Sequence, residues 1–410
     1  MTLSWYDSVM PSAVHQSFAS DRIAAVHALA ATPGSEAYLA PDLIDVEAWN
    51  FVGDPLCEAL LTVMRERRLM GGDIYANARS LEADGVPEAV AFFADVEAVP
   101  MWADFDAMRS GAAMAKRNPV GLLFGAHGAL PFTYIDPATA KVMNSTGRLG
   151  AGGDYQRRFW ETATGFVGAI DVDGMKPGGA EWQKWVRIRF LHTMIRMGIL
   201  RSGRWDLRES MPIGQVPSAG TAHLFGPFRV AIIRFMGGHV TKAEENSFAL
   251  MWRWIARIEG ANNQLLGRTH DEQFRLQSRI HQFLYHPTED AAVLTEALIE
   301  GSARTKQFGL PKRLHAALVR RFLTEDMMQT LPGRHFADDL GMKSDRAADA
   351  ALLAVTSGLR AFNQLTRIPG LKRASERRGI QLINHVVEHG LDGVKAEYRG
   401  TPVAGVATDK

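Results

Sequence analysis

The stretch EWQKWVRIRFLHTMIRMGIL, residues Glu181–Leu200, carries the clearest structural signal in the chain. Its apolar residues recur every three or four positions, which predicts a long helix. Three and four residues from His192 lie Ile188, Arg189, Ile195 and Arg196. Because such positions are neighbours on a helix, one stripe carries the imidazole and two guanidinium groups, and its flank is aliphatic.

The same spacing recurs along most of the chain, as in DPLCEALLTVMRERRLM at Asp54–Met70, where Pro55 suits a first helical turn. Further segments with this pattern are 21–31, 86–97, 103–117, 155–170, 180–200, 215–236, 241–258, 270–284, 288–302, 310–323, 346–362 and 376–389. No stretch alternates like a strand, and no repeat of 20–50 residues is evident. We therefore predict an all-α protein: a single large helical domain at 46–370, an N-terminal helical extension at 1–45, and a C-terminal helix with a polar tail at 371–410.

The composition excludes several classes of protein. Lysine and arginine number 46 against 45 acidic residues, a net charge of +1, which argues against nucleic-acid partners. The single cysteine, Cys57, excludes an internal disulfide, a thiolate-rich zinc site and covalent haem attachment. No secretory signal is visible, and the longest apolar run, Val120–Leu130, is too short to be a transmembrane segment. We expect a soluble, cytoplasmic chain, or a secreted one if a signal segment has been trimmed; its oligomeric state stays open.

Two histidine arrangements compete as metal sites. His385 and His389 form HVVEH, the inverted zinc-protease signature, but few acids follow to complete a zinc site, so a solvated helix end is the simpler interpretation. His192 lies among aliphatic residues and arginines, which suits a haem. The imidazole would bind iron, Ile188 and Ile195 would pack the macrocycle, and Arg189 or Arg196 would pair with a propionate. Periodicity alone also allows a histidine on a partly solvated face. Four other histidines, His15, His27, His315 and His335, need no function.

Five ordered motifs lie between Val99 and Gly226. They are VPMWADFDAMRSGAAMA (99–115), LPFTYIDPATAKVMNSTGRL (130–149), RRFWETATGF (157–166), IRFLHTMIR (188–196) and MPIGQVPSAGTAHLF (211–225). Together they resemble the latex-clearing protein family, the haem b rubber oxygenases, and the related MpaB-type oxygenases. The second motif looks like the turn before the family's distal helix, the third like that helix, and the fourth like the proximal helix. The likeness is weaker before residue 50 and after about 270.

The resemblance implies a globin-like helical core that binds haem b. It also implies a dioxygenase that uses O2 to cleave C=C bonds of an isoprenoid or polyisoprene-like alkene into an aldehyde and a ketone. His192 matches the proximal iron ligand, and Arg158 and Thr162 match the distal arginine and threonine. Some relatives have a lysine just before that threonine, where this chain has Glu161. This departure puts a lysine-capped resting state in doubt and offers a carboxylate as general base.

The distal segment also supports this chemistry on its own residues. On a helix, Arg158, Glu161, Thr162 and Gly165 share one face, which combines a cation, a base, a hydroxyl and a gap that suit bound oxygen. An ordinary surface Arg–Glu pair is the alternative. Two other functions stay open: a non-catalytic haem protein that binds or senses O2, and a peroxide-using peroxidase or peroxygenase. Because polymeric rubber cannot enter a cell, a cytoplasmic enzyme would act on a smaller prenyl chain or unsaturated lipid.

Overall fold

The computed structural model describes residues 21–145, 155–303 and 310–390, which form helices and short 3-10 turns and no strand. The all-α prediction is confirmed. The described helices are α3 (Asp21–Ala30), α4 (Val46–Trp49), α5 (Pro55–Glu66), α6 (Ile74–Ala83), α7 (Pro87–Glu97), α8 (Phe105–Arg117), α9 (Pro119–Thr133), α10 (Pro137–Ser145), α11 (Tyr155–Gly168), α12 (Ala180–Arg201), α13 (Gln215–Leu224), α14 (Pro227–Phe235), α15 (Lys242–Ile258), α16 (His270–Leu284), α17 (Glu289–Ala303), α18 (Lys312–Phe322), α19 (Glu325–Met328), α20 (Phe336–Asp339), α21 (Arg346–Asn363) and α22 (Pro369–Gly390).

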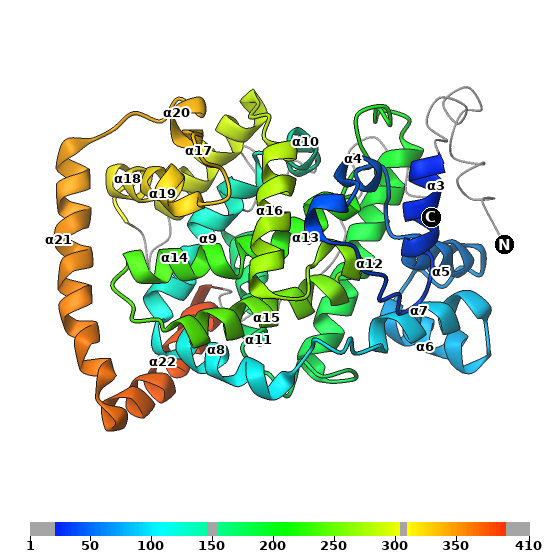
Figure 1. Cartoon of the computed structure of the whole chain (residues 1–410), viewed down its shortest axis with the longest axis horizontal. Helices are drawn as coiled ribbons and strands as arrows, with labels where there is room; N and C mark the ends of the chain where they lie inside the picture. The colour runs from blue at the N-terminus through cyan, green and yellow to red at the C-terminus, as the bar shows by residue number, and fades with distance from the viewer. Residues whose placement is uncertain (1–20, 146–154, 304–309, 391–410) are drawn as a thin grey trace.

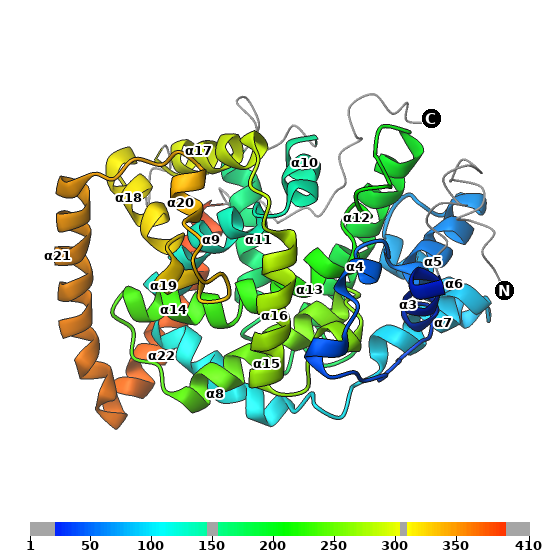
Figure 2. The same ribbon diagram turned by 45° about the horizontal axis from the view of Figure 1, so that its top comes forward.

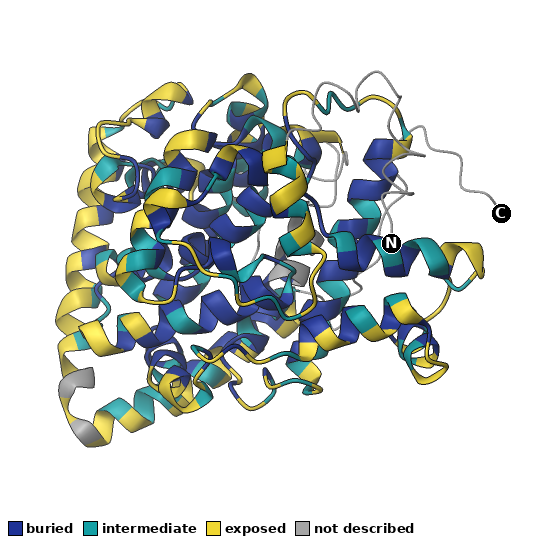
Figure 3. Cartoon of the chain, turned by 45° about the vertical axis from the view of Figure 1, so that its right-hand side comes forward, coloured by how far each residue is buried: buried dark blue, intermediate teal, exposed yellow. Residues whose placement is uncertain are grey.

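The helices form one body with distinct ends. Helices α3 to α7 gather at one end of the long axis, and α21 forms the opposite edge (Figures 1 and 2). Helices α9 and α11 to α16 fill the space between them. Buried residues concentrate in this middle region, whereas α21 is exposed along most of its length (Figure 3). A single large apolar core therefore joins the central helices, with a small satellite cluster around Trp160.

Close packing of α9 against α14 fixes the centre of the molecule. A β-carbon added to Gly121 would lie 2.8 Å from the Cα of Ile233, and one added to Gly125 would lie 2.7 Å from the Cγ of Arg229. Both distances are shorter than carbon atoms tolerate, so glycine lets the two helices approach. The stem of Arg229 consequently lies against the backbone of α9.

The structure differs from the predicted helices at several places. The segment 215–236 is not one helix: α13 ends at Leu224 and α14 starts at Pro227, with Gly226 between them. Proline lacks an N–H and disfavours a helical residue before it, which explains the break. The apolar run Val120–Leu130 lies within α9, and α10 occupies much of the motif read as a turn. Helix α22 starts at Pro369, seven residues before the predicted segment.

Helix α22 packs against α8 and α11, so the C-terminal helix contributes to the central body. The division of the chain at residues 45 and 370 and the globin-like topology stay predictions. Among the described helices, none combines the length and the apolar character that crossing a membrane requires.

Candidate cofactor site and active site

The candidate site is built on α12, whose two faces differ in their environment. Arg189 and Arg196 are 2% and 3% exposed and face the protein interior. Ile188, His192 and Ile195 are half-buried and follow one another at helical spacing. His192 therefore lies on the boundary between an arginine row turned into the core and an aliphatic stripe that remains partly open.

The imidazole of His192 is neutral and unengaged. No described residue forms a hydrogen bond with its ring, and burial lowers its pKa to about 4, with the charge of nearby Arg196 as a further cause. A histidine with this pKa carries no proton charge at neutral pH, so one ring nitrogen keeps its lone pair. Such a nitrogen is the form in which histidine binds a metal.

Arg189 is held by two carboxylates from the N-terminal helices. Its Nε and Nη2 donate to Asp54 at 2.6 and 2.9 Å, and its Nη1 donates to Asp95 at 2.9 Å. Arg257 of α15 donates to the other oxygen of Asp95 at 2.6 Å. Burial alone would raise the pKa of Asp95, but Arg257 and Arg189 outweigh it and hold this pKa below its usual range. These four residues form a buried, charge-balanced network.

Arg196 is held in a similar way two turns further along α12. Its Nη1 donates to Glu58 at 3.0 Å, and its Nε donates to the carbonyls of Pro212 and Ile213 at 3.1 and 3.2 Å. Ile213 has a φ of 50°, a conformation that costs a β-branched residue free energy and persists where surrounding contacts impose it. Gln215, two residues after Ile213, adds two hydrogen bonds by donating to the carbonyls of Gly53 and Gly260.

These contacts change the interpretation of the motif R-x-x-H-x-x-x-R. Both arginines donate to groups of the protein, and they lie about 100° around α12 from Ile188 and Ile195. They fix the rotation of the helix and hence the direction of His192. Their predicted contact with a propionate receives no support from these hydrogen bonds and stays a prediction.

Helix α11 runs antiparallel to α12 and faces it. A β-carbon on Gly165 would lie 3.5 Å from the Trp185 ring, and Gly168 packs against Glu181. If the two helices continued side by side in this order, Thr162 would come opposite Ile188 and Arg158 opposite His192. The two recorded contacts are therefore compatible with the predicted distal segment lying at the level of His192.

The side chains of Arg158, Glu161 and Thr162 lie outside the described residues. Their helix is described, and its bounds include all three positions. Their catalytic roles therefore stay predictions.

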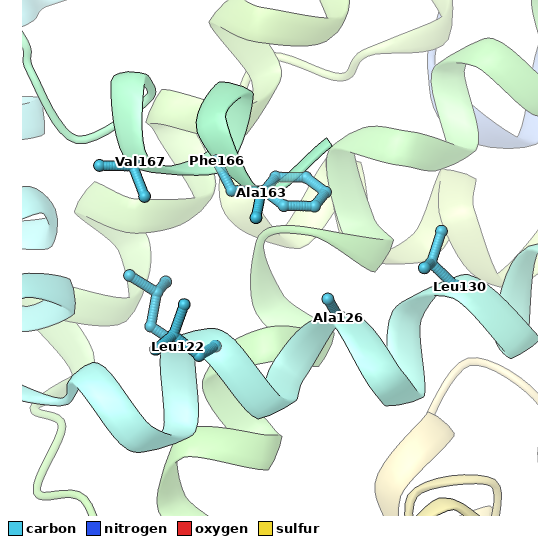
Figure 4. Close-up of a pocket in the computed structure, with 7 residues that line it drawn as sticks. Leu122, Ala126, Leu130, Ala163, Phe166 and Val167 are labelled. Carbon is cyan, nitrogen blue, oxygen red and sulfur yellow. The ribbon is translucent and has the colours of Figure 1, made fainter. Parts of the chain in front are cut away.

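A small apolar cavity lies between α9 and α11 (Figure 4). Its volume is about 20 Å³, room for about one water molecule or methyl group. Only apolar side chains line it: Leu122, Leu123, Ala126, Leu130, Ala163, Phe166 and Val167. Ala163 directly follows the predicted distal residue Thr162, so the space beside the distal segment favours apolar ligands.

Two buried ionisable residues near this site escaped the sequence analysis. Glu259, at the end of α15, has its pKa raised to about 8 by burial, although a hydrogen bond with Thr221 opposes the shift. Arg229 of α14 is fully buried, which lowers its pKa to about 9. Glu259 sits at an unremarkable helix end. Arg229 did leave a signal, because Phe225, Ile232 and Ile233 at helical spacing mark its face as apolar.

The competing zinc arrangement is incomplete in the described part of the chain. The rings of His385 and His389 lie 3.9 Å apart between centroids, and Nδ1 of His389 is hydrogen-bonded to the carbonyl of His385. Among the described residues no group of three histidine, cysteine or acidic side chains is placed to hold a metal ion.

Fold and site together define an all-α protein in which buried ion pairs orient a helix that carries one neutral histidine. Comparison with known proteins narrows this class. The chain is 24% identical over 278 residues to a protein described as rubber oxygenase from Streptomyces sp. (strain K30); the match covers 67% of this chain and 65% of that one, just under two thirds of its length. No protein-family model matches the chain.

The fold is similar to that of latex clearing protein LCP in its closed state. The TM-score is 0.58 at 19% sequence identity, and the match covers 85% of this chain and 95% of the other. The predicted resemblance to the latex-clearing protein family is therefore confirmed in sequence and in fold.

Proposed function

We propose that this chain is a haem b-dependent oxygenase that uses O2 to cleave C=C bonds of an isoprenoid or polyisoprene-like alkene, giving an aldehyde and a ketone. The observation that carries the proposal is His192, a neutral imidazole at the edge of an aliphatic stripe on a rigidly held helix, with which no described residue forms a hydrogen bond. The similarity in sequence to a rubber oxygenase supports the same activity.

The residues around His192 fit a haem in their chemistry. A b-type haem bound through His192 would supply the iron that activates O2. Ile188 and Ile195 offer aliphatic contacts for the macrocycle on the open side of α12. Arg189 and Arg196 support the site indirectly. Their ion pairs prevent rotation of α12 and so keep the His192 imidazole in place.

The distal helix would supply the polar groups. If Arg158 and Thr162 lie at the level of His192, their cation and hydroxyl would orient oxygen and stabilise negative charge that develops on it. Glu161 would remove an allylic proton from the alkene and return it before the products leave, because the aldehyde and ketone together keep every hydrogen of the alkene. A carboxylate can do so only if desolvation raises its pKa toward neutrality.

The substrate is inferred from the lining of the site. An alkene offers no polar handle, so its binding depends on apolar contact and shape. The cavity between α9 and α11 provides wholly apolar walls beside the distal segment, and at about 20 Å³ it would have to widen to admit an alkene chain. Both oxygen atoms of O2 would end in the two carbonyl products, which requires one O2 for each double bond cleaved.

The test is to incubate the purified full chain with a polyisoprene emulsion and, separately, with a short isoprenoid, and to measure O2 uptake together with carbonyl products. We expect one O2 consumed per aldehyde–ketone pair, and no products from the His192→Ala variant. Equal product formation by that variant contradicts the proposal. Turnover that needs hydrogen peroxide instead of O2 indicates a peroxygenase.

A second variant separates catalysis from oxygen binding. Glu161→Gln has nearly the same shape but cannot accept a proton as a carboxylate does. We expect it to keep O2 binding and to lose most turnover. Unchanged turnover in Glu161→Gln removes this residue from the proposed mechanism, and absence of turnover in the wild type favours an oxygen-binding protein.

A further inference from the structure

Arg229 is a buried guanidinium for which the described residues provide no hydrogen-bond acceptor. Its side chain is 0% exposed, and none of its three nitrogens forms a hydrogen bond. With a pKa of about 9 it remains charged at neutral pH. An unpaired charge in the interior is costly, since the desolvation of the ion is not offset by a counter-ion.

The other buried arginines show that this is an exception within the described residues. Six described arginines are less than a tenth exposed, and five of them donate to carboxylates or carbonyls: Arg117, Arg189, Arg196, Arg253 and Arg257. Arg253 is the nearest match to Arg229, because it also stacks on an aromatic ring, that of Trp102 at 4.1 Å. Its guanidinium nevertheless donates to the carbonyls of Gly267 and Arg268.

The surroundings of Arg229 contain more unused donors. Its guanidinium carbon lies 4.2, 5.4 and 5.7 Å from the ring centres of Phe166, Phe225 and Trp252. The ring of Trp252 is 5.9 Å from that of Trp185, and neither indole N–H has a hydrogen-bond partner. A cation and two N–H donors thus gather in an aromatic box in which the described residues place no acceptor.

This aromatic box adjoins the proposed site. Phe166 both stacks on Arg229 and lines the apolar cavity between α9 and α11 (Figure 4). It also lies one helical turn beyond Thr162. Trp185 lies two turns before His192 on α12. The unused donors therefore border the space between the distal segment and the proposed iron ligand.

We propose that Arg229, with the indoles of Trp185 and Trp252, forms a buried receptor for a carboxylate carried by an apolar molecule. A carboxylate supplies a single negative charge and two acceptor oxygens whose spacing matches the guanidinium fork. The aromatic walls offer apolar contact to the rest of the molecule, and the cavity of about 20 Å³ has to widen to hold more of it than a methyl group. A ligand reaching Arg229 from the cavity has to displace the Phe166 ring.

Two sources carry this chemistry. One is a propionate of the haem, and this version rests on the proposed function. The other is a long-chain fatty acid, whose binding does not depend on haem. Both place a carboxylate at Arg229 and apolar carbon beyond it.

The test compares acids with neutral partners of the same shape on the full chain. Haem b is titrated against its dimethyl ester and followed by absorbance, and oleate is titrated against oleyl alcohol by calorimetry. If a haem propionate is the ligand, we expect the wild type to bind haem b on the order of tenfold to a hundredfold more tightly than the dimethyl ester. If a fatty acid is the ligand, we expect the same preference for oleate over oleyl alcohol. Equal binding within both pairs overturns the proposal and requires no variant.

The variant Arg229→Met removes the charge and keeps a long side chain that packs against rings. We expect its ligand-free form to unfold at a urea concentration no lower than the wild type, because an uncompensated buried charge has been removed. We also expect it to lose the preference for the acid. The matched control is Arg253→Met, which should unfold at a lower urea concentration and keep that preference.

Each outcome distinguishes a version of the proposal. Loss of the haem preference in Arg229→Met identifies the propionate, and loss of the oleate preference identifies a fatty acid. Strong destabilisation of ligand-free Arg229→Met, or a preference for the acid equal to the wild type's, overturns the receptor. A chain that binds no haem contradicts the proposed function, while the oleate titration still decides the present inference.

Discussion

The buried arginines behind α12 and the buried arginine on α14 are equally hidden from water but differ in their counter-charges. Arg189 and Arg257 share Asp95, and Asp54 completes the network. Arg229 has aromatic rings around it and no acceptor among the described residues. The first group holds α12 in place using only residues of the chain. The second leaves a positive charge uncompensated where we propose that a ligand binds.

The largest effect on stability is expected from removing the counter-charge that Arg189 and Arg257 share. Asp95→Asn leaves Arg189 and Arg257 with a neutral partner in a dry interior, so we expect a loss of about 3–5 kcal/mol in the free energy of unfolding. Urea denaturation at pH 7 measures it. A loss comparable to that of an exposed ion pair would show that Asp95 does not hold the network together.

The same network predicts how stability responds to acid. The pKa of Asp95 is lowered in the folded state, so its contribution is present above the unfolded value of about 3.9 and is lost as the pH falls below it. The difference in stability between wild type and Asp95→Asn should therefore shrink between pH 5 and pH 3. Urea midpoints at these pH values provide the check; a constant difference contradicts the assignment.

Glu259 offers a contrast, because it is a half-buried acid whose ionisation is disfavoured by its surroundings. Its pKa is raised to about 8, so the folded chain keeps the proton that the unfolded chain loses above about pH 4.5. Its stabilising contribution is present at low pH and declines as the pH rises through 8. We expect Glu259→Gln to match the wild type near pH 5 and to be more stable by about 1–3 kcal/mol near pH 8, as measured by thermal unfolding.

The smallest effect is expected at the surface. Arg109 donates to both oxygens of Asp173 at 2.9 Å, but the two side chains are half exposed, so water and salt screen the pair. Asp173→Asn should leave the urea midpoint close to that of the wild type. A shift as large as that of Asp95→Asn would show that burial does not set the difference between the two ion pairs.

Local pattern predicted the helices well where the apolar spacing is regular. Helix α12, with His192 at the edge of an aliphatic flank, was predicted from one stretch of sequence. The apolar spacing continues across Gly226 and Pro227, because α13 and α14 bury similar faces. It therefore predicted one helix where the structure has two. It missed α9 because glycine and apolar residues cover every side of that helix and leave no amphipathic contrast.

The partners of the motif arginines were beyond sequence reasoning. Asp54 lies 135 residues from Arg189 in the chain, and only the packing of α5 against α12 brings them together. Acid groups at such distances carry no local signature. For the same reason, the sequence identified the arginines beside His192 but assigned them to a cofactor, whereas the structure shows them in ion pairs within the protein.

The most direct test of the central claim is a pyridine haemochrome measurement on the full chain, purified after expression with ample iron and haem precursor. We predict about one b-type haem per wild-type chain and very little in a folded His192→Ala variant. A colourless wild type, or a His192→Ala variant with the wild-type haem content, would contradict the assignment of His192 as the iron ligand.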